Sequence, residues 1–569
     1  MGKRQHTNIN EAVELTQNRK NEESEETDSD YSPSQSSKNR ETLRLENPQK
    51  RKKRRLQSDQ PARLSNPNEQ AGGDTNQIHP RSSHDIQSPS AIRLGLLRWY
   101  TGVHASRGMP WRKPYDPSQG PEERAQRAYE VWVSEIMLQQ TQVATVIPYY
   151  SRWMSQFPTI HSLASATVDE VNGLWKGLGY YSRASRLLAG AKKAVANYGG
   201  RLPDNAKDME ANIPGIGRYS AGAICSIAYG ERVPVLDGNV NRLLSRLLAL
   251  HAPPKAKATL DILWAAASIL VELDPVGSTE SQDHDASATP MEQTQYPGDI
   301  NQALIELGST VCKVREPDCG SCPLRPWCRG FITAGPEGII PEIIPDIEDA
   351  CTLCEPLPEG STITSYPMKV ERKKAREELD VVNVIEWRAR TNPTERHFLL
   401  VRRPEGGLLA GLYEFPTSSN ISKATSRNAM AGIPNKLLAG LIVPTVLTRD
   451  TKRHGSINTD NLQIKSTQFV GDVVHVFSHI KKTYRAQWVI LEGGEAPPPL
   501  RLADDGRRGK RVKNHTAENL IDGKVSTSLL PIGAMWVKLK DVGNVNMGTG
   551  VVKVWNLTRD LWERELSGA

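Results

Sequence analysis

The sequence predicts a multidomain protein in which an all-α domain is followed by an α+β domain. Two observations carry this prediction. Apolar residues recur at helical spacing from about residue 90 to 275, and β-rich segments begin after Leu379. A third observation marks the end of the helical part, where four cysteines lie between Cys312 and Cys328. A chain of 569 residues is long enough for two or three such domains.

The composition is ordinary for a soluble protein, with 38% hydrophobic and 24% charged residues. The net charge of +7 permits nucleic-acid binding without demonstrating it. Gly, Arg or polar residues interrupt the longest apolar stretches, so we expect no membrane span. The N-terminal residues lack the apolar core of a secretory signal, so we expect the protein to stay inside the cell. A disulfide framework is disfavoured there.

Residues 1–88 are rich in Ser, Asn, Gln, Glu and Arg and poor in large apolar side chains, which predicts a disordered tail. Within it, the basic run 50–55 favours a nuclear import signal over a DNA-backbone contact or a merely solvated tail. We therefore expect the protein in the nucleus. Whether mitochondria are also served is left open by the sequence.

The predicted helical domain covers residues 89–330 and carries a polar, low-complexity stretch at 277–298 that we expect to be a surface insertion. Its predicted helices span 92–100, 131–150, 184–198, 221–229, 240–250 and 301–308. Residues 331–378 are rich in Pro and Glu and are interpreted as a linker.

The predicted α+β domain covers residues 379–560 and contains a second expected insertion at 503–524. Its predicted strands span 381–385, 398–401, 473–477 and 486–491.

The four clustered cysteines have the spacing Cys-x6-Cys-x2-Cys-x5-Cys. They are Cys312, Cys319, Cys322 and Cys328. Four thiolates this close in sequence suit either zinc or a [4Fe–4S] cluster, and the spacing alone leaves both metals open. Lys313 and Arg315 lie between the first two cysteines, where a metal-bound loop would present them to phosphates; the alternative is that they are merely solvated.

The run 213–221 reads Ile-Pro-Gly-Ile-Gly-Arg-Tyr-Ser-Ala and lies between two expected helices. Gly215 and Gly217 allow a tight turn whose backbone N–H groups, with the dipole of the following helix, favour a phosphate oxygen. The pattern therefore predicts a helix-hairpin-helix motif, with a plain interhelical turn as the alternative.

Two carboxylates lie in opposed environments. Glu135 lies in the apolar run 131–138, where burial would raise its pKa and keep it protonated near neutral pH. Asp237 precedes a predicted helix, where an N-cap would keep the carboxylate ionised. One protonated and one charged acid is the arrangement that glycosidic cleavage requires. Each residue alone has an ordinary explanation, because Asp is common at N-caps and an isolated Glu usually faces solvent.

Several runs together resemble the adenine DNA glycosylases of the MutY type. These runs are 132–143, 177–183, 237–240 with Arg242, 304–308 and the four-cysteine spacing. The resemblance extends almost continuously over residues 90–330. It implies a helix-hairpin-helix glycosylase domain with a [4Fe–4S] cluster loop. It also implies binding of double-stranded DNA and removal of adenine paired with 8-oxoguanine or guanine.

The resemblance also implies residue roles. Glu135 should protonate the adenine ring, Asp237 should stabilise the oxocarbenium-like sugar, and Tyr219 and Asn239 should orient that site. Residues expected to line the flipped adenine or to wedge into the duplex are Met109, Trp111, Arg112, Gln140 and Tyr180. Core packing is the alternative for Trp111 and Tyr180.

Endonuclease III-type enzymes share this fold and also cut the DNA backbone, with a lysine just after the Gly-x-Gly-Arg turn. Here that position is Tyr219, so imine formation with the sugar is unavailable and a glycosylase without lyase activity is favoured. A non-catalytic DNA-binding cluster protein is a further alternative, and the presence of both Glu135 and Asp237 disfavours it.

The C-terminal region resembles the Nudix-like recognition domain of the same family, on the run 407–416. No Arg-Glu-x-x-Glu-Glu array follows Phe415, so we expect no phosphohydrolase activity. Phe477, Ser478 and His479 resemble the loop that senses 8-oxoguanine, with an ordinary hairpin turn as the alternative.

The predicted linker carries a second cysteine pair, Cys351 and Cys354. By resemblance, eukaryotic relatives place a zinc site here, to which His84 would contribute, although the expected third cysteine is missing. Ile347 and Glu348 resemble a docking site for a checkpoint clamp. We expect the protein to be a monomer.

Overall fold

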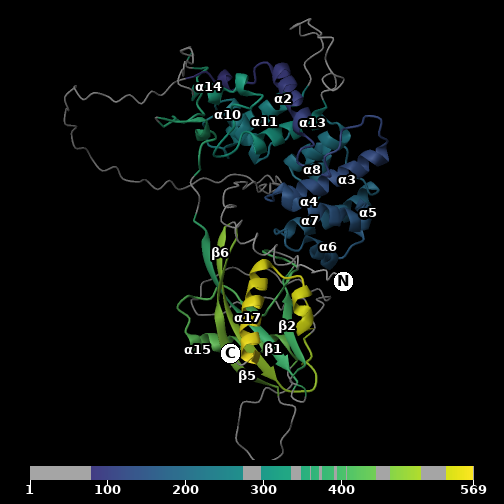
Figure 1. Cartoon of the computed structure of the whole chain (residues 1–569), viewed down its shortest axis with the longest axis vertical. Helices are drawn as coiled ribbons and strands as arrows, with labels where there is room; N and C mark the ends of the chain where they lie inside the picture. Colours follow the sequence, from purple (N-terminus) through teal and green to yellow (C-terminus); the bar gives the residue numbers. More distant parts are fainter. Residues whose placement is uncertain are drawn as a thin grey trace, which may run out of the picture. The chain divides into compact units, whose positions relative to one another are not determined.

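A computed structural model describes residues 79–272, 296–334, 346, 348–358, 360–370, 374–389, 392, 394–404, 407–443, 462–477, 479–501 and 533–567. Figure 1 shows their helices and strands along the chain. The chain divides into two compact units: unit 1 covers Met1–Gly120, Asp204–Ala211 and Ile216–Val370, and unit 2 covers Pro121–Pro203, Asn212–Gly215 and Glu371–Ala569. The predicted helical domain at 89–330 is therefore shared between the two units.

Unit 1 is built from helices. Its α-helices are α2 (Pro89–Val103), α8 (Ala206–Asn212, whose last residue groups with unit 2), α9 (Arg218–Ile224), α10 (Gly238–Leu247), α11 (Lys257–Val271), α13 (Pro297–Thr310) and α14 (Arg329–Thr333). A π-helical turn, η2 (Cys225–Tyr229), continues α9, and short 3-10 helices are η1 (Arg81–His84), η3 (Arg325–Trp327) and η4 (Ile363–Ser365). Its core lies where α13 packs against α2 and α10.

The N-terminal part of unit 2 is also helical. Its helices are α3 (Pro121–Leu138), α4 (Val143–Gln156), α5 (Ile160–Ala164), α6 (Val168–Trp175) and α7 (Ser182–Tyr198). The indole rings of Trp153 and Trp175 meet edge to face at 5.5 Å, which joins α4 to α6.

The C-terminal part of unit 2 is an α+β domain, as predicted. Its strands are β1 (Arg376–Arg388), β2 (Arg396–Arg402), β3 (Tyr413–Glu414), β4 (Thr417–Ser418), β5 (Gln463–Val476), β6 (Ile480–Glu492) and β7 (Ala534–Lys538). The strand order is β3-β2-β1-β6-β5, with β4 beside β1 and β7 beside β2. β1 and β6 run parallel, and the other pairs are antiparallel.

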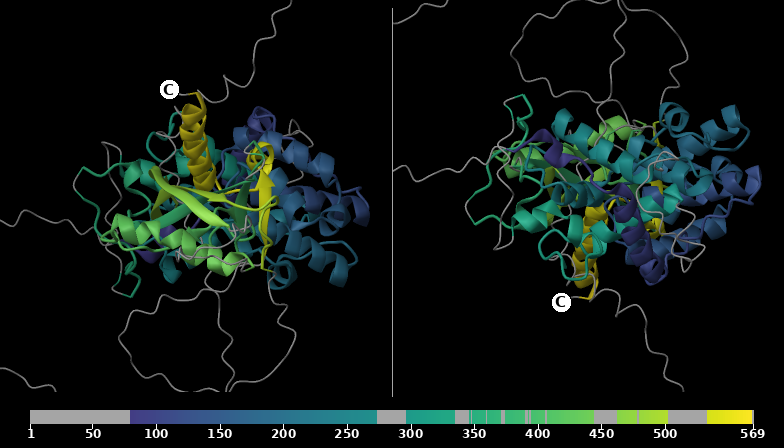
Figure 2. Two further views of the ribbon diagram at one scale, coloured as in Figure 1. Left: turned by 90° about the horizontal axis from the view of Figure 1, so that it is seen from below. Right: turned by 90° about the horizontal axis from the view of Figure 1, so that it is seen from above.

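Helices cover both faces of this sheet. Val554 and Trp555 of α17 (Thr549–Ser567) pack on one face, and Leu438 and Leu441 of α16 (Ile433–Leu441) pack on the other. Figure 2 shows α17 in yellow on one side and the green helices on the other. The remaining elements are α15 (Arg427–Ala431) and η5 (Leu539–Asn544).

The single helix predicted at 131–150 is wrong, because α3 ends at Leu138 and α4 begins at Val143. Gln140, between them, has a left-handed backbone with φ of 54°. The guanidinium of Arg183 accounts for the break, since it takes carbonyl oxygens at the end of α3 that a continuing helix would need.

Part of the range predicted as tail is structured. His84 is buried, and Pro80 forms a β-bridge with Ala350. The basic run 50–55, the insertion expected at 503–524 and most of that expected at 277–298 lie outside the described residues, and residues 297 and 298 open α13. None of the helices in the described ranges is long and apolar enough to cross a membrane.

Candidate active site and cysteine clusters

The predicted hairpin lies between α8 and α9. Gly215 has a φ of 83°, and a Cβ there would come within 2.6 Å of the Cβ of Arg186, so only glycine fits this turn. Gly217 is the N-cap residue of α9, which also carries the partly exposed side chain of Tyr219.

Asp237 is the N-cap residue of α10, as predicted. Its Oδ1 accepts a hydrogen bond of 2.7 Å from the backbone N–H of Val240, and its Oδ2 accepts one of 2.9 Å from Nδ2 of Asn239. Burial raises the pKa of Asp237 above its usual value, in opposition to the N-cap effect from which we predicted an ionised carboxylate. The two hydrogen bonds and the charge of Arg242 favour the anion and counteract that effect without outweighing it.

Arg242 connects this carboxylate to the cysteine loop. Its Nη2 donates to Oδ1 of Asn239 at 3.0 Å and to the Gly308 carbonyl at 2.7 Å. Its Nε donates to the Cys312 carbonyl at 3.0 Å. The amide of Asn239 is thereby fixed, with its oxygen toward Arg242 and its nitrogen toward Asp237. Arg242 was not predicted as a site residue, although its i, i+3 spacing from Asn239 on a helix was the available signal.

Glu135 lies in the last turn of α3 and is partly buried, whereas we expected full burial. Its neighbours Ser134 and Ile136 are buried. Glu135 belongs to unit 2, and Asp237 and Tyr219 belong to unit 1.

The two predicted wedge residues both have left-handed backbones in unit 2. Gln140 is exposed between α3 and α4, and Tyr180 is 49% exposed in the turn between α6 and α7, with φ of 47°. Core packing is therefore excluded for Tyr180. The indole of Trp175 holds this turn by donating to the Gly179 carbonyl at 2.9 Å.

The segment expected to line the adenine is anchored to α13. Met109 and Trp111 are buried, and Nη2 of Arg112 donates to Oε2 of Glu306 at 2.7 Å. Arg107 also pairs with Glu306, which is only 2% exposed. Glu306 was not predicted as a functional residue, although a lone acid between Ile305 and Leu307 was a usable signal.

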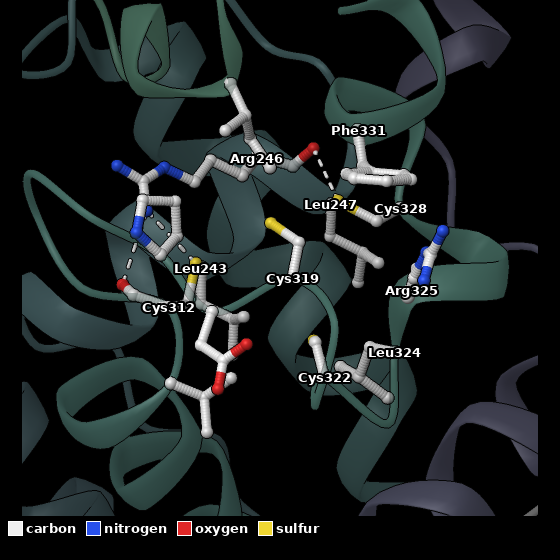
Figure 3. A pocket seen from close by; sticks show the side chains of 14 residues that line it. Leu243, Arg246, Leu247, Cys312, Cys319, Cys322, Leu324, Arg325, Cys328 and Phe331 are labelled. Carbon is white, nitrogen blue, oxygen red and sulfur yellow. Dashed lines mark hydrogen bonds between the residues drawn. The ribbon is translucent and has the colours of Figure 1, made fainter. Parts of the chain in front are cut away.

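The four clustered cysteines line one cavity, as their spacing predicted. Figure 3 shows all four around it, with Arg246 at its side. Nη1 of Arg246 donates to Sγ of Cys312 at 3.2 Å, and burial raises the pKa of Cys322 to about 11 and that of Cys328 to about 12. Four thiols that form no disulfide, two of them buried and two partly buried, line one apolar cavity and fit a four-thiolate metal centre, because a bound cation would stabilise their anions.

Lys313 and Arg315 are exposed on the loop between the first two cysteines. The Lys313 carbonyl accepts from Nη1 of Arg246 at 2.6 Å, and the Val314 carbonyl accepts from its Nη2 at 3.0 Å. The buried guanidinium therefore fixes the loop backbone while the two cationic side chains remain in solvent.

A second cluster joins the N-terminal segment to the linker. Ligand atoms of His79, His84, Cys351 and Cys354 all lie within 4.8 Å of one another. The Nε2 atom of His84 lies 3.4 Å from each of the two Sγ atoms and 3.1 Å from Nε2 of His79. Ligands about 2.0–2.3 Å from a tetrahedral zinc ion are separated by roughly 3.3–3.8 Å, so this spacing fits zinc.

His79 is a fourth potential ligand, which we did not predict from the sequence. The spacing His79-x4-His84 falls within the range of paired zinc histidines and was the available signal. Burial lowers the pKa of His84 to about 4, which keeps its imidazole neutral, as a metal ligand must be.

The remaining predicted site lies between β5 and β6. Phe477 is partly buried against the ring of His475 at 4.6 Å, and His479 is exposed. The backbone N–H of Phe477 donates to the Ile480 carbonyl at 2.8 Å, which closes a hairpin turn. Ser478 and Ile347 lie outside the described residues, and Glu348 is exposed in a turn.

The sequence is similar to those of several DNA repair proteins. Residues 133–267 match the model of the HhH-GPD superfamily of base excision DNA repair proteins. The adenine DNA glycosylase of Rattus norvegicus is 39% identical over 72% of this chain and 72% of its own length. That of Homo sapiens is 39% identical over 72% of this chain and 68% of its own length. A thermostable thymine-DNA glycosylase is 22% identical, covering 42% of this chain and 94% of its own, with a TM-score of 0.32.

Proposed function

Because the chain belongs to the adenine DNA glycosylases, we propose that the adenine it excises lies opposite 8-oxoguanine or guanine in double-stranded DNA. We propose that Glu135 and Asp237 carry the cleavage. The observation that carries these roles is the hydrogen-bonded chain from Cys312 through Arg242 and Asn239 to Asp237, which orients one carboxylate within a buried site.

In this proposal Asp237 acts on the sugar. As the bond from C1′ to the base breaks, positive charge develops on the sugar ring, and a nearby carboxylate stabilises it. The hydrogen bonds from Val240 and Asn239 favour the anion that this role requires. Tyr219 and Asn239 help to orient the site.

Glu135 donates a proton to the adenine ring, which makes the base a better leaving group. This role requires the protonated form of Glu135, which lies partly buried in the last turn of α3. Tyr219 provides no amine for imine formation, so water completes the reaction and the strand is left uncut.

The duplex is opened and read by other residues. Gln140 and Tyr180 enter the stack where adenine leaves it, and the segment with Met109, Trp111 and Arg112 lines the extruded base. Phe477, Ser478 and His479 read 8-oxoguanine. Phosphates are held by Gly215, Gly217, Lys313 and Arg315. The exposure of Tyr180, Lys313 and Arg315 supports these contacts.

We propose two metal centres. Cys312, Cys319, Cys322 and Cys328 hold a [4Fe–4S] cluster, which when bound fixes the loop that carries Lys313 and Arg315. His79, His84, Cys351 and Cys354 hold a structural zinc ion that ties the linker to the segment before α2. The neutral His84 and the mutual spacing of the four ligand atoms support this second centre.

We further propose a nuclear location through residues 50–55 and docking of a checkpoint clamp at Ile347 and Glu348. The exposure of Glu348 supports the docking site. Replacing both residues by Ala should abolish capture of the clamp and should leave excision of adenine unchanged.

A duplex with one A:8-oxoguanine pair tests the function. The expected product is a strand that breaks only after treatment with alkali. Strand breakage without alkali would support the endonuclease III-type alternative. Tight binding of the duplex with no product would support a non-catalytic protein. Glu135→Gln should abolish excision while binding persists, and unchanged excision would remove Glu135 from the mechanism. An A:C pair serves as the control substrate.

A further inference from the structure

The guanidinium of Arg183, on the first turn of α7, is 4% exposed and faces backbone carbonyls. Its Nη1 donates to the carbonyls of Ile136 at 3.0 Å, Met137 at 2.9 Å and Gln139 at 2.6 Å. These oxygens lie at the end of α3, where helix carbonyls lack partners within the helix and the helix dipole is negative. Arg183 therefore terminates the helix that carries Glu135.

The other side of the same guanidinium holds the turn that carries Tyr180. Nη2 donates to the carbonyls of Leu178 at 3.2 Å and Gly179 at 3.1 Å, and the charge lies 5.5 Å from the ring centre of Tyr180. Tyr180 has a φ of 47°, which is strained for a residue with a side chain, so this turn depends on contacts such as these to keep its path. One side chain thus bonds two segments about 40 residues apart in sequence.

We propose that Arg183 is a positioning residue that makes the Tyr180 turn and the end of α3 move as one body. Insertion of Tyr180 into the duplex then brings Glu135 into place for the extruded adenine. This inference rests on the proposed roles of Tyr180 and Glu135 and adds the coupling between them. Glu135 lies within one residue of a carbonyl that Arg183 holds, so a shift of the guanidinium moves the backbone beside the acid.

Arg suits this role better than Lys does. A planar guanidinium offers five N–H donors in a fixed fork, whereas an ammonium offers three donors from one point. Burial lowers the pKa of Arg183 to about 10, and the group remains a cation at neutral pH. Its charge lies against the partial negative charge of the helix end.

The test compares the wild-type chain with Arg183→Lys. Extrusion is measured from the fluorescence of 2-aminopurine opposite 8-oxoguanine, in a Glu135→Gln background that blocks cleavage, and excision of adenine is measured under single turnover. Arg183→Lys should reduce extrusion and should also reduce excision per extruded base by about 10- to 100-fold, because sub-ångström placement of a catalytic group is worth factors of this size.

Two further variants distinguish a loss of coupling between the Tyr180 turn and α3 from a general loss of rigidity in these helices. Tyr149→Phe removes the hydroxyl that donates to the Lys176 carbonyl at 2.9 Å, at the start of the turn, and leaves the bonds to α3 intact. It should reduce extrusion alone. Arg201→Lys makes the matched substitution in an exposed ion pair with Glu122, at the opposite ends of α7 and α3, and should change neither measurement.

Wild-type values for Arg183→Lys in both assays would overturn the proposal, as would a loss of extrusion with normal excision per extruded base. If Arg183→Lys does not fold, hydrogen exchange of the wild-type chain decides. Amides of 137–141 and 177–180 should gain protection together on binding the duplex, and independent protection would overturn the coupling. A wild-type chain that extrudes the base but releases no adenine would instead refute the proposed function.

Discussion

Replacing Asn239 by Ala tests how Asp237 is kept ionised. The side chain of Asn239 donates a hydrogen bond of 2.9 Å to Oδ2 of Asp237, in a site where burial already raises the pKa of that carboxyl. A hydrogen bond to a charged group contributes about 1.5–3 kcal/mol, and one pKa unit corresponds to about 1.4 kcal/mol. Losing the bond should therefore destabilise the anion by about that much and raise the pKa of Asp237 further.

The consequence is a shift of the pH profile with a defined sign. Because the proposed mechanism uses the anion, excision falls as the pH drops below the pKa of Asp237, about tenfold per unit. In Asn239→Ala the acid limb of the single-turnover profile should move to higher pH, and rates on that limb should fall about 10- to 100-fold. Rates at pH values above that limb should change less.

Asn241→Ala is the matched control, because Asn241 lies two residues further along α10. Its profile should coincide with that of the wild-type chain. An Asn239→Ala profile lowered equally at every pH, with no shift of its acid limb, would refute the reasoning, because the amide would then act through something other than the ionisation of Asp237.

Three further predictions follow from buried contacts. His79→Ala should lower bound zinc and the melting temperature, as measured by metal analysis and calorimetry. His104→Ala, at a partly exposed histidine outside this cluster, should leave the zinc content unchanged, and full zinc retention in His79→Ala would exclude His79 as a ligand. Glu306→Ala leaves the Arg112 guanidinium without its acidic partner and should destabilise unit 1 by about 3–5 kcal/mol. The loss should be measured as a lower denaturant concentration at the unfolding midpoint, and Glu306→Gln should recover part of it. Gly190→Ala places a methyl group 2.8 Å from the ring of Trp132 and should cost about 1–3 kcal/mol in thermal unfolding, while Gly102→Ala, which meets nothing within 4 Å, should be neutral or stabilising.

The local patterns of this sequence predicted the helices α2, α7, α10 and α13 and the strands β1, β2, β5 and β6, because hydrophobic spacing and caps are encoded nearby in the chain. They did not predict the long helices α11 and α17. The N-cap role of Asp237 and the common cavity of the four cysteines were both predicted from such patterns. The break after Leu138 was not, because Arg183 is 44 residues away from the Gln139 carbonyl that it binds. Periodicity contains no information about a partner so distant in sequence.

Electrostatic balance was the other part that the sequence did not reveal. The N-cap position of Asp237 favours the anion, but burial, which is a property of the folded site, raises its pKa. His79 was missed for a related reason, since its partners Cys351 and Cys354 lie more than 260 residues away, and only folding brings the four groups together.

The contacts of His84 and Cys351 close a ring of the polypeptide, because these residues are 267 positions apart and an ion held between them would act as a clasp. By the loop-entropy relation for a covalent cross-link, a ring of this size restricts the unfolded chain by about 5–6 kcal/mol, an upper bound for an exchangeable ion. A chelator that removes the ion should then destabilise the whole segment between His84 and Cys351, and not only the residues next to the ion. A polypeptide shortened to begin at residue 79 keeps the clasp, whereas one that begins at residue 85 opens it and should become readily digestible by protease.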